Sequence, residues 1–278
     1  MPYSGILQRW ETFLLNIEKR FHEQLTAAAA VLPSLLNLQD FNTQPFANAW
    51  QGIESQMKEL IAKIDDTWSE KVSPAFDEIK EKEEEAVSEA GGDLEEYHAA
   101  FYPVYYEAMN KGRALQHYLS KELKVYQVST FAEAARKLSA RASEILSGNF
   151  CCSQCQAPLP VQQQFFRSYY QTCDYCQTVN TFEPGTIARN VEHFALQPLA
   201  EEAALDEYLH YYDLEHRYRS QRDDEPQDIS GEELLAVYKV FAEKYLKARI
   251  AIIPDYQQQY EKDLAAKIEF VRKYVINP

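Results

Sequence analysis

The feature that most constrains the fold of this chain is a pair of CxxC motifs within residues 149–185. Cys152 and Cys155 form the first motif, and Cys173 and Cys176 form the second after an interval of 17 residues. Each CxxC turn directs two sulfur atoms at one point, so two such turns supply the four ligands of a tetrahedral metal site. The spacing therefore predicts one metal ion held by four thiolates.

This segment resembles the zinc-ribbon group of folds, in which each CxxC motif forms a turn at the end of a β-hairpin. The resemblance covers this segment only and implies that the same four cysteines bind zinc. It also implies short strands at residues 161–166, 169–172 and 179–182. Ribbon turns often carry glycine after the second cysteine, where a positive φ is favoured, whereas this chain has Gln156 and Gln177.

The ligand set predicts a structural role for the metal. Four thiolates complete a tetrahedron and leave no position for water or substrate, so we expect one structural zinc ion per chain. Iron is the alternative metal, because rubredoxin-type sites use the same four ligands. Cys151 directly precedes the first motif and is a rival to Cys152 as ligand. The CxxC spacing favours Cys152, and Cys151 is expected to be a buried thiol or one that contacts the metal ligands, with its role left open.

Outside this segment, apolar residues recur every three or four positions, which is typical of amphipathic α-helices. Helices are expected at about residues 4–30, 46–89 with an interruption at Pro74, 93–128, 130–146, 201–221, 230–253 and 255–275. Thr130 with Glu133 has the spacing of a capping box, and so has Ser230 with Glu233. The predicted fold is mainly α: a bundle of long helices, packed as in a coiled coil, with a small β zinc ribbon inserted.

The chain is expected to divide into three parts. A helical region occupies residues 1–147, the zinc ribbon occupies residues 148–187, and a second helical region at residues 188–278 packs on the first. Two separate helical domains joined through the ribbon are the alternative. Irregular backbone is expected at residues 186–200, and a polar loop containing proline at residues 223–227.

Charge and hydropathy limit the partners and the location of the chain. The formal charge is −15, from 28 basic against 43 acidic side chains, which disfavours nucleic acid and anionic membranes as partners. The longest uncharged apolar run lies within residues 25–38 and is interrupted by Pro33, too short for a span of about 20 residues. No export signal is visible, so the paired CxxC motifs indicate a reducing, cytoplasmic location.

The sequence favours a non-enzymatic, zinc-binding protein that serves as a protein–protein interaction or scaffold module. No nucleophile motif or phosphate-binding loop is present, and 8 glycines are few for a fold that binds nucleotides through glycine-rich turns. Which protein partners it binds, and its oligomeric state, are left open by these patterns.

The main alternative is a rubrerythrin-like oxidoreductase, with iron at the four cysteines and a di-metal site in the helical bundle. Two ExxH patterns prompt it, Glu95 with His98 and Glu207 with His210. All ligands of such a site must face the interior of the bundle. Glu207 and His210 are instead expected to face solvent, away from the apolar stripe of their helix.

Overall fold

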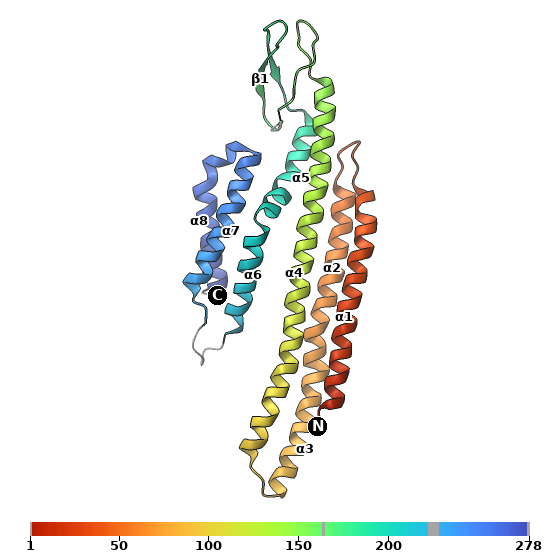
Figure 1. The fold of residues 1–278 in the computed structure, drawn as a ribbon, viewed down its shortest axis with the longest axis vertical. Helices are drawn as coiled ribbons and strands as arrows, with labels where there is room; N and C mark the ends of the chain where they lie inside the picture. Colours follow the sequence, from red (N-terminus) through yellow and green to blue (C-terminus); the bar gives the residue numbers. More distant parts are fainter. Residues whose placement is uncertain (1, 163–164, 222–227, 277–278) are drawn as a thin grey trace. The chain divides into compact units, whose positions relative to one another are not determined.

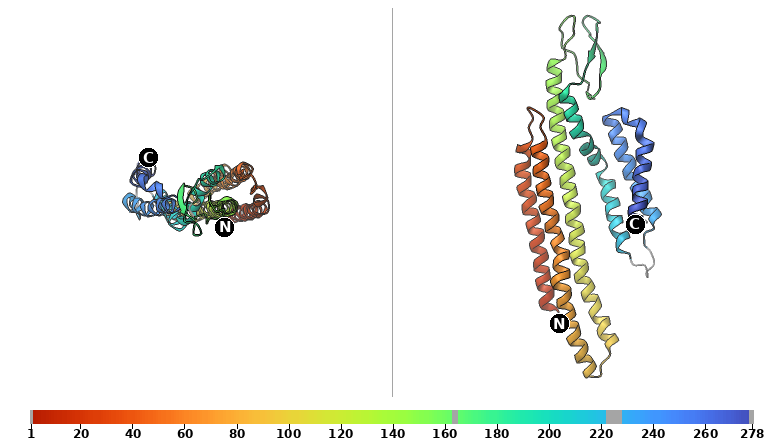
Figure 2. Two further views of the ribbon diagram at one scale, coloured as in Figure 1. Left: turned by 90° about the horizontal axis from the view of Figure 1, so that it is seen from above. Right: turned by 180° about the vertical axis from the view of Figure 1, so that it is seen from behind.

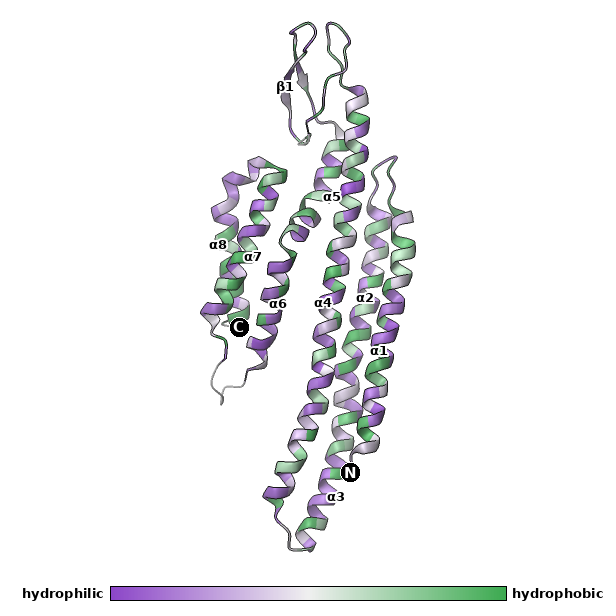
Figure 3. Ribbon diagram, in the orientation of Figure 1, coloured by the Kyte–Doolittle hydropathy of each residue, from purple (hydrophilic) through white to green (hydrophobic). Residues whose placement is uncertain are grey.

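The computed structural model describes residues 2–162, 165–221 and 228–276. Most of these residues lie in helices, and two short strands lie next to the cysteines (Figure 1). The prediction of a mainly α fold is therefore confirmed. Figure 3 shows apolar and polar residues alternating along the long helices, as amphipathic packing requires.

The chain forms two compact units, one made of Met1–Pro33 and Phe46–Lys124, the other of Ser34–Pro45 and Val125–Pro278. The three-part division predicted from the sequence, with boundaries near residues 147 and 187, stays a prediction. The coiled-coil character of the helices also stays a prediction. Within the described ranges, no helix is both long enough and apolar enough to cross a membrane.

The first unit is a set of antiparallel helices. It contains α1 (Ser4–Val31), α2 (Gln44–Thr67), α3 (Ser73–Glu89) and the first part of α4 (Leu94–Asn149). Figures 1 and 2 show α1, α2 and this part of α4 side by side. A π-helical turn at Trp68–Val72 joins α2 to α3. The interruption expected at Pro74 is thus one wider turn, after which Pro74 occupies the first turn of α3, where it costs no hydrogen bond.

Aromatic side chains fill the core of this first unit. Trp10 of α1 is 1% exposed, and its indole Nε1 donates to the carbonyl of Ala108 on α4 at 2.8 Å. A Cβ added at Gly112 would lie 2.7 Å from the Trp10 ring, so glycine at this position permits the close approach of the two helices. The hydroxyl groups of Tyr3 and Tyr97 hydrogen-bond each other at 2.8 Å in the same unit.

Helix α4 is continuous over 56 residues and contributes to both units. The predicted break before Thr130, with a capping box to Glu133, is wrong. Glu133 lies inside the helix and pairs with Lys137 one turn later at 2.6 Å. Buried residues continue at helical spacing through this point: Val128, Ala132, Ala135 and Leu138. Because this buried stripe holds the helix against the core, the capping sequence does not start a new helix.

The second unit contains the rest of α4, the two strands, and the helices α5 (Thr186–Ala203), α6 (Leu205–Ser220), α7 (Gly231–Ile252) and α8 (Tyr260–Val271). The irregular backbone expected at residues 186–200 is wrong, since this stretch forms most of α5. Its buried face consists largely of small residues with a weak hydrophobic signal: Ala188, Val191, Ala195 and Ala200. The helix predicted at residues 201–221 is therefore two helices, α5 ending at Ala203 and α6 following.

The capping box that begins α7 is present. The Ser230 hydroxyl accepts from the Glu233 N–H at 3.2 Å, and the Glu233 carboxylate accepts from the Ser230 N–H at 2.8 Å. Helix α7 ends directly before Ile253 and Pro254, since proline cannot continue the hydrogen-bond ladder. The loop expected at residues 223–227 lies outside the described residues.

The two strands pair antiparallel beside the cysteines. In β1 (Tyr169–Thr172) and β2 (Val179–Phe182), Tyr169 lies opposite Phe182 and Thr172 lies opposite Val179. These two expected strands are present, but the strand expected at residues 161–166 is not. Residues 163 and 164 lie outside the described residues, residues 161 and 162 are irregular, and residues 165 and 166 form a turn.

The third strand fails because consecutive phenylalanines, Phe165 and Phe166, are both buried, whereas a strand would alternate its side chains between two faces. With Phe182 they belong to one core with the facing sides of α4 and α5. The helical members of that core include Ala135, Leu138, Ala142, Ala188 and Val191. The cysteine-bearing segment therefore shares its hydrophobic core with the helices that flank it in the chain.

Candidate metal centre

The structure brings together the four sulfur atoms predicted from the sequence. The Sγ atoms of Cys152, Cys155, Cys173 and Cys176 all lie within 4.8 Å of one another. The separation is 3.4 Å between Cys152 and Cys176, and 3.5 Å between Cys155 and Cys173. Sulfur atoms bound at ~2.3 Å to one tetrahedral ion lie about 3.8 Å apart, so the cluster fits a shared ion. A disulfide bond of about 2.05 Å is excluded at these distances.

The two CxxC turns are held by the same backbone hydrogen bonds. In the first turn the Cys152 N–H donates to the Ala157 carbonyl at 2.8 Å, and the Gln156 N–H donates to the Cys152 carbonyl at 3.0 Å. The second turn repeats both bonds at 2.9 Å, from the N–H groups of Cys173 and Gln177. Each turn therefore presents its two sulfur atoms on a fixed backbone.

The residue after the second cysteine adopts a left-handed conformation in both turns. Gln156 has a φ of 62° and Gln177 a φ of 61°. This is the conformation in which ribbon-like turns favour glycine, and it costs roughly 1–2 kcal/mol for a residue with a Cβ. The departure from glycine seen in the sequence therefore leaves the turn geometry intact, at the expense of local backbone strain.

Asn180 is a contributor that the sequence analysis missed. This residue of β2 is 7% exposed, and its Oδ1 accepts from the N–H and the hydroxyl of Ser153, at 2.9 and 3.0 Å. Its Nδ2 donates to the Thr178 carbonyl at 3.0 Å and lies 3.7 Å from the Cys152 sulfur. One side chain thus ties the first turn to the second and faces a ligand sulfur, as outer groups of metal sites do. The sequence contained one sign of this role: Asn180 is a polar residue two positions before Phe182, so both lie on the same, buried face of β2.

Burial around the site differs between the cysteines of each motif. Cys152 and Cys173 are fully buried and pack against Leu159, whereas Cys155 is exposed and Cys176 is half-buried. Cys151 is exposed, so the expectation that it is buried is wrong, and it lies outside the cluster of mutually close sulfur atoms. The spacing argument that favoured Cys152 over its neighbour agrees with this geometry.

The pKa values of Cys152, Cys155 and Cys176 are shifted in different directions. A hydrogen bond from the Cys155 backbone N–H lowers the pKa of Cys152 to about 6, despite burial. The Ala157 N–H lowers the pKa of Cys155, but burial and the neighbouring thiols outweigh it and raise that pKa to about 12. Hydrogen bonding with the side chain and backbone of Thr178 lowers the pKa of Cys176. A divalent cation favours the thiolate form of all its ligands. A bound cation would therefore lower the pKa of every ligand cysteine, including that of Cys155.

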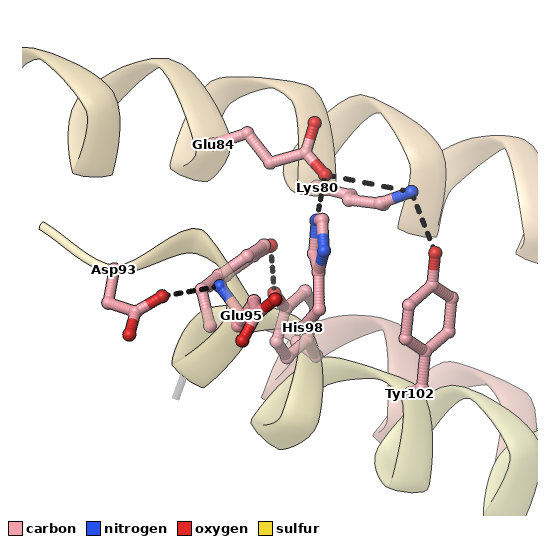
Figure 4. A network of polar contacts seen from close by, with 8 residues as sticks. Lys80, Glu84, Asp93, Glu95, His98 and Tyr102 are labelled. Atoms are coloured by element: carbon pink, nitrogen blue, oxygen red, sulfur yellow. Dashed lines mark hydrogen bonds and ion pairs between the residues drawn. The ribbon is translucent and has the colours of Figure 1, made fainter.

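In the first ExxH pattern, the side chain of His98 contacts Glu84 of α3. Figure 4 shows the first pattern: His98 Nε2 lies 2.5 Å from Glu84, and Lys80 lies 3.6 Å from the same oxygen. The hydrogen bond from His98 is the main cause that lowers the pKa of Glu84. The Glu95 N–H donates to the Asp93 carboxylate at 2.8 Å, which is typical of a helix start.

The second ExxH pattern is also paired differently from a metal site. The Glu207 carboxylate accepts from Lys244 at 2.6 and 2.8 Å, and His210 is exposed. Over the parts of the chain that the structure describes, the cysteine cluster is the one group of three or more such side chains whose ligand atoms converge. Among the described residues, neither ExxH pattern therefore belongs to a converging ligand set of the kind that the di-metal alternative requires.

No protein-family model, curated protein or solved structure matches this chain. The resemblance to zinc ribbons accordingly rests on the motif spacing and the local geometry, and membership of that group stays a prediction. The cluster is a possible metal site whose geometry suits zinc and iron alike, since both are bound tetrahedrally by four thiolates.

Proposed function

We propose that this chain is a non-enzymatic interaction or scaffold protein whose four clustered cysteines hold one structural zinc ion. The convergence of the four sulfur atoms within 4.8 Å carries the proposal. A complete set of thiolates leaves no coordination position for substrate, so the ion holds backbone together. A reducing compartment such as the cytoplasm keeps the thiols free to bind it.

The proposed role of the metal is to hold the two CxxC turns together. The two CxxC turns are packed around only a small core, in which Cys152 and Cys173 are buried with Leu159. The phenylalanines Phe165, Phe166 and Phe182 of the segment pack instead on the helical core. Burial therefore holds one end of the segment, and metal coordination is needed to hold the other end.

The acidic surface favours a protein as the partner over nucleic acid or an anionic membrane. Between residues 54 and 96 the chain has 15 acidic and 5 basic side chains. Several of the basic ones are paired within their own helix, as in the pair of Lys82 with Glu78 at 2.7 Å. A polyanion would meet net repulsion along this whole segment.

Metal analysis of the purified full chain tests the proposal. We expect about one zinc per chain by mass spectrometry. Cys173→Ser should lose the metal, because it removes a buried ligand, whereas Cys151→Ser should retain it. Retention of full zinc by Cys173→Ser would show that the ligand set is wrong. Two or more iron atoms per chain, with visible absorption, would instead favour the rubrerythrin-like alternative.

A further inference from the structure

The outer face of the β1–β2 hairpin exposes apolar and aromatic side chains. Tyr170 is 78% exposed and Val179 is 60% exposed, on neighbouring strands. The register pairs Tyr170 with Thr181 and Thr172 with Val179, so all four project from the face opposite to the buried Phe182. Tyr175, in the turn between the strands, is 82% exposed, the largest exposure among the exposed large apolar and aromatic side chains of the described chain.

The cysteine-bearing segment that contains this hairpin has a negative net charge. Between residues 149 and 185 the basic residue is Arg167, against Asp174 and Glu183. Arg167 is already held by two carboxylates, with Nη1 2.8 Å from Glu192 and Nε 2.8 Å from Asp255. Four thiolates around a divalent ion add a further formal charge of about −2. The exposed tyrosines therefore lie in a segment of negative net charge. Its basic residue, Arg167, is already paired with Glu192 and Asp255.

The backbone of the hairpin is also open to a partner. The sheet has two strands, and within the described residues no third strand pairs with the outer edge of either. Such edges offer N–H and C=O groups to an extended peptide. Tyrosine rings attract lysine and arginine side chains through cation–π contacts.

We infer that the outer face of the hairpin (Tyr170, Thr172, Val179 and Thr181), together with Tyr175 of the turn, binds an extended segment of a partner protein that carries lysine or arginine. The inference rests on the proposed function, and names the chemistry of the partner. A second copy of this chain would bring the same negative charge to the face, and nucleic acid would bring more. A basic peptide is the occupant that gains from both the charge and the exposed rings.

Titration of the isotope-labelled, metal-loaded full chain with a short peptide of alternating lysine and threonine tests this inference. We expect NMR shift changes on the hairpin, at Tyr170, Tyr175 and Val179, and weaker binding at higher salt. The double variant Tyr170→Ser with Tyr175→Ser should bind about fivefold to tenfold more weakly. Tyr274→Ser, at another exposed tyrosine far along the chain, should bind as the unmodified chain does.

Three results would overturn the inference: shift changes confined to the acidic helix α3, equal binding of the double variant, or equal binding of a matched glutamate peptide or single-stranded DNA. Zinc content is measured on the same samples. Both tyrosines are exposed and are not ligands, so the variants should keep their metal. Failure of the unmodified, zinc-loaded chain to bind the lysine peptide contradicts this inference alone, whereas an unmodified chain without bound metal contradicts the proposed function.

Discussion

At the scale of single residues, the candidate metal centre depends on side chains other than its sulfur ligands. Asn180 accepts two hydrogen bonds from Ser153 and donates one to Thr178, so it links the two CxxC turns through its amide. The amide also lies 3.7 Å from the Cys152 sulfur, where an N–H group stabilises thiolate charge. Removing it should loosen the ligand geometry without removing a ligand.

Replacement of Asn180 by alanine should weaken zinc binding by roughly 10- to 100-fold, the usual effect of losing a group that orients metal ligands. Competition with a chromophoric chelator measures the change. Thr181→Ala is the matched control, because Thr181 is the next residue of β2 and faces solvent. Equal zinc affinity in the two variants would mean that the Asn180 amide has no part in the site.

The four sulfur positions could be predicted from spacing because CxxC is a local signal: both cysteines of a pair sit on one turn. The left-handed Gln156 and Gln177 follow from the same turn geometry. Asn180 could not be assigned in this way. Its role depends on which strand face meets the turns, and a four-residue strand carries too few side chains to fix that from pattern alone.

At the scale of elements, the close contact of α1 and α4 limits which residues α4 tolerates. Trp10 contacts α4 both through its hydrogen bond to Ala108 and through its ring, which lies against Gly112. An indole that is 1% exposed has little room to move aside. Gly112 therefore has a packing role within the helix, despite its poor helix propensity.

Gly112→Ala should destabilise the chain by about 1–3 kcal/mol, because the added methyl overlaps the Trp10 ring. Gly52→Ala should instead stabilise it by up to about 1 kcal/mol, the normal gain for glycine replacement within a helix. Gly52 lies in α2, and nothing lies within 4 Å of a Cβ placed there. Urea unfolding measures the change in the free energy of unfolding for both variants. A stabilised Gly112→Ala variant would contradict the packing role of Gly112.

The long helices were predictable because large apolar residues repeat at helical spacing over many turns. Two local signals misled the sequence analysis. Thr130 and Glu133 have capping-box spacing, but the buried stripe of α4 continues past them. The stretch at residues 186–200 is helical with a buried face of mostly small side chains, whose burial depends on the neighbouring α4 rather than on local pattern.

At the scale of the whole molecule, the cysteine segment and the helices of the second unit share one core. Phe165, Phe166 and Phe182 come from the segment, and pack with residues of α4 and α5. A second core, formed by α6, α7 and α8, contains none of these residues. Loss of metal should therefore affect the core that the cysteine segment shares with α4 and α5, and leave the core of α6, α7 and α8 intact.

Removal of zinc by a chelator should leave most of the helical circular dichroism, because the helices keep their own buried faces. It should increase binding of a hydrophobic dye and cleavage by protease between residues 149 and 185. Without the metal, the two CxxC turns are no longer held together, and the phenylalanines packed beside them become accessible. Re-addition of zinc should reverse both changes. Cooperative loss of the helical signal on chelation would show instead that the metal controls the folding of the whole chain.

The unequal burial of the sulfur atoms concerns the kinetics of metal exchange rather than affinity. In each motif the first cysteine is buried, whereas Cys155 is exposed and Cys176 is half-buried. An incoming chelator or thiol would therefore meet these two sulfurs first, and ligand exchange would begin at the solvent side. We therefore expect a metal ion bound by the four cysteines to dissociate in steps. Its bonds to Cys155 and Cys176 break first, and its bonds to Cys152 and Cys173 break last.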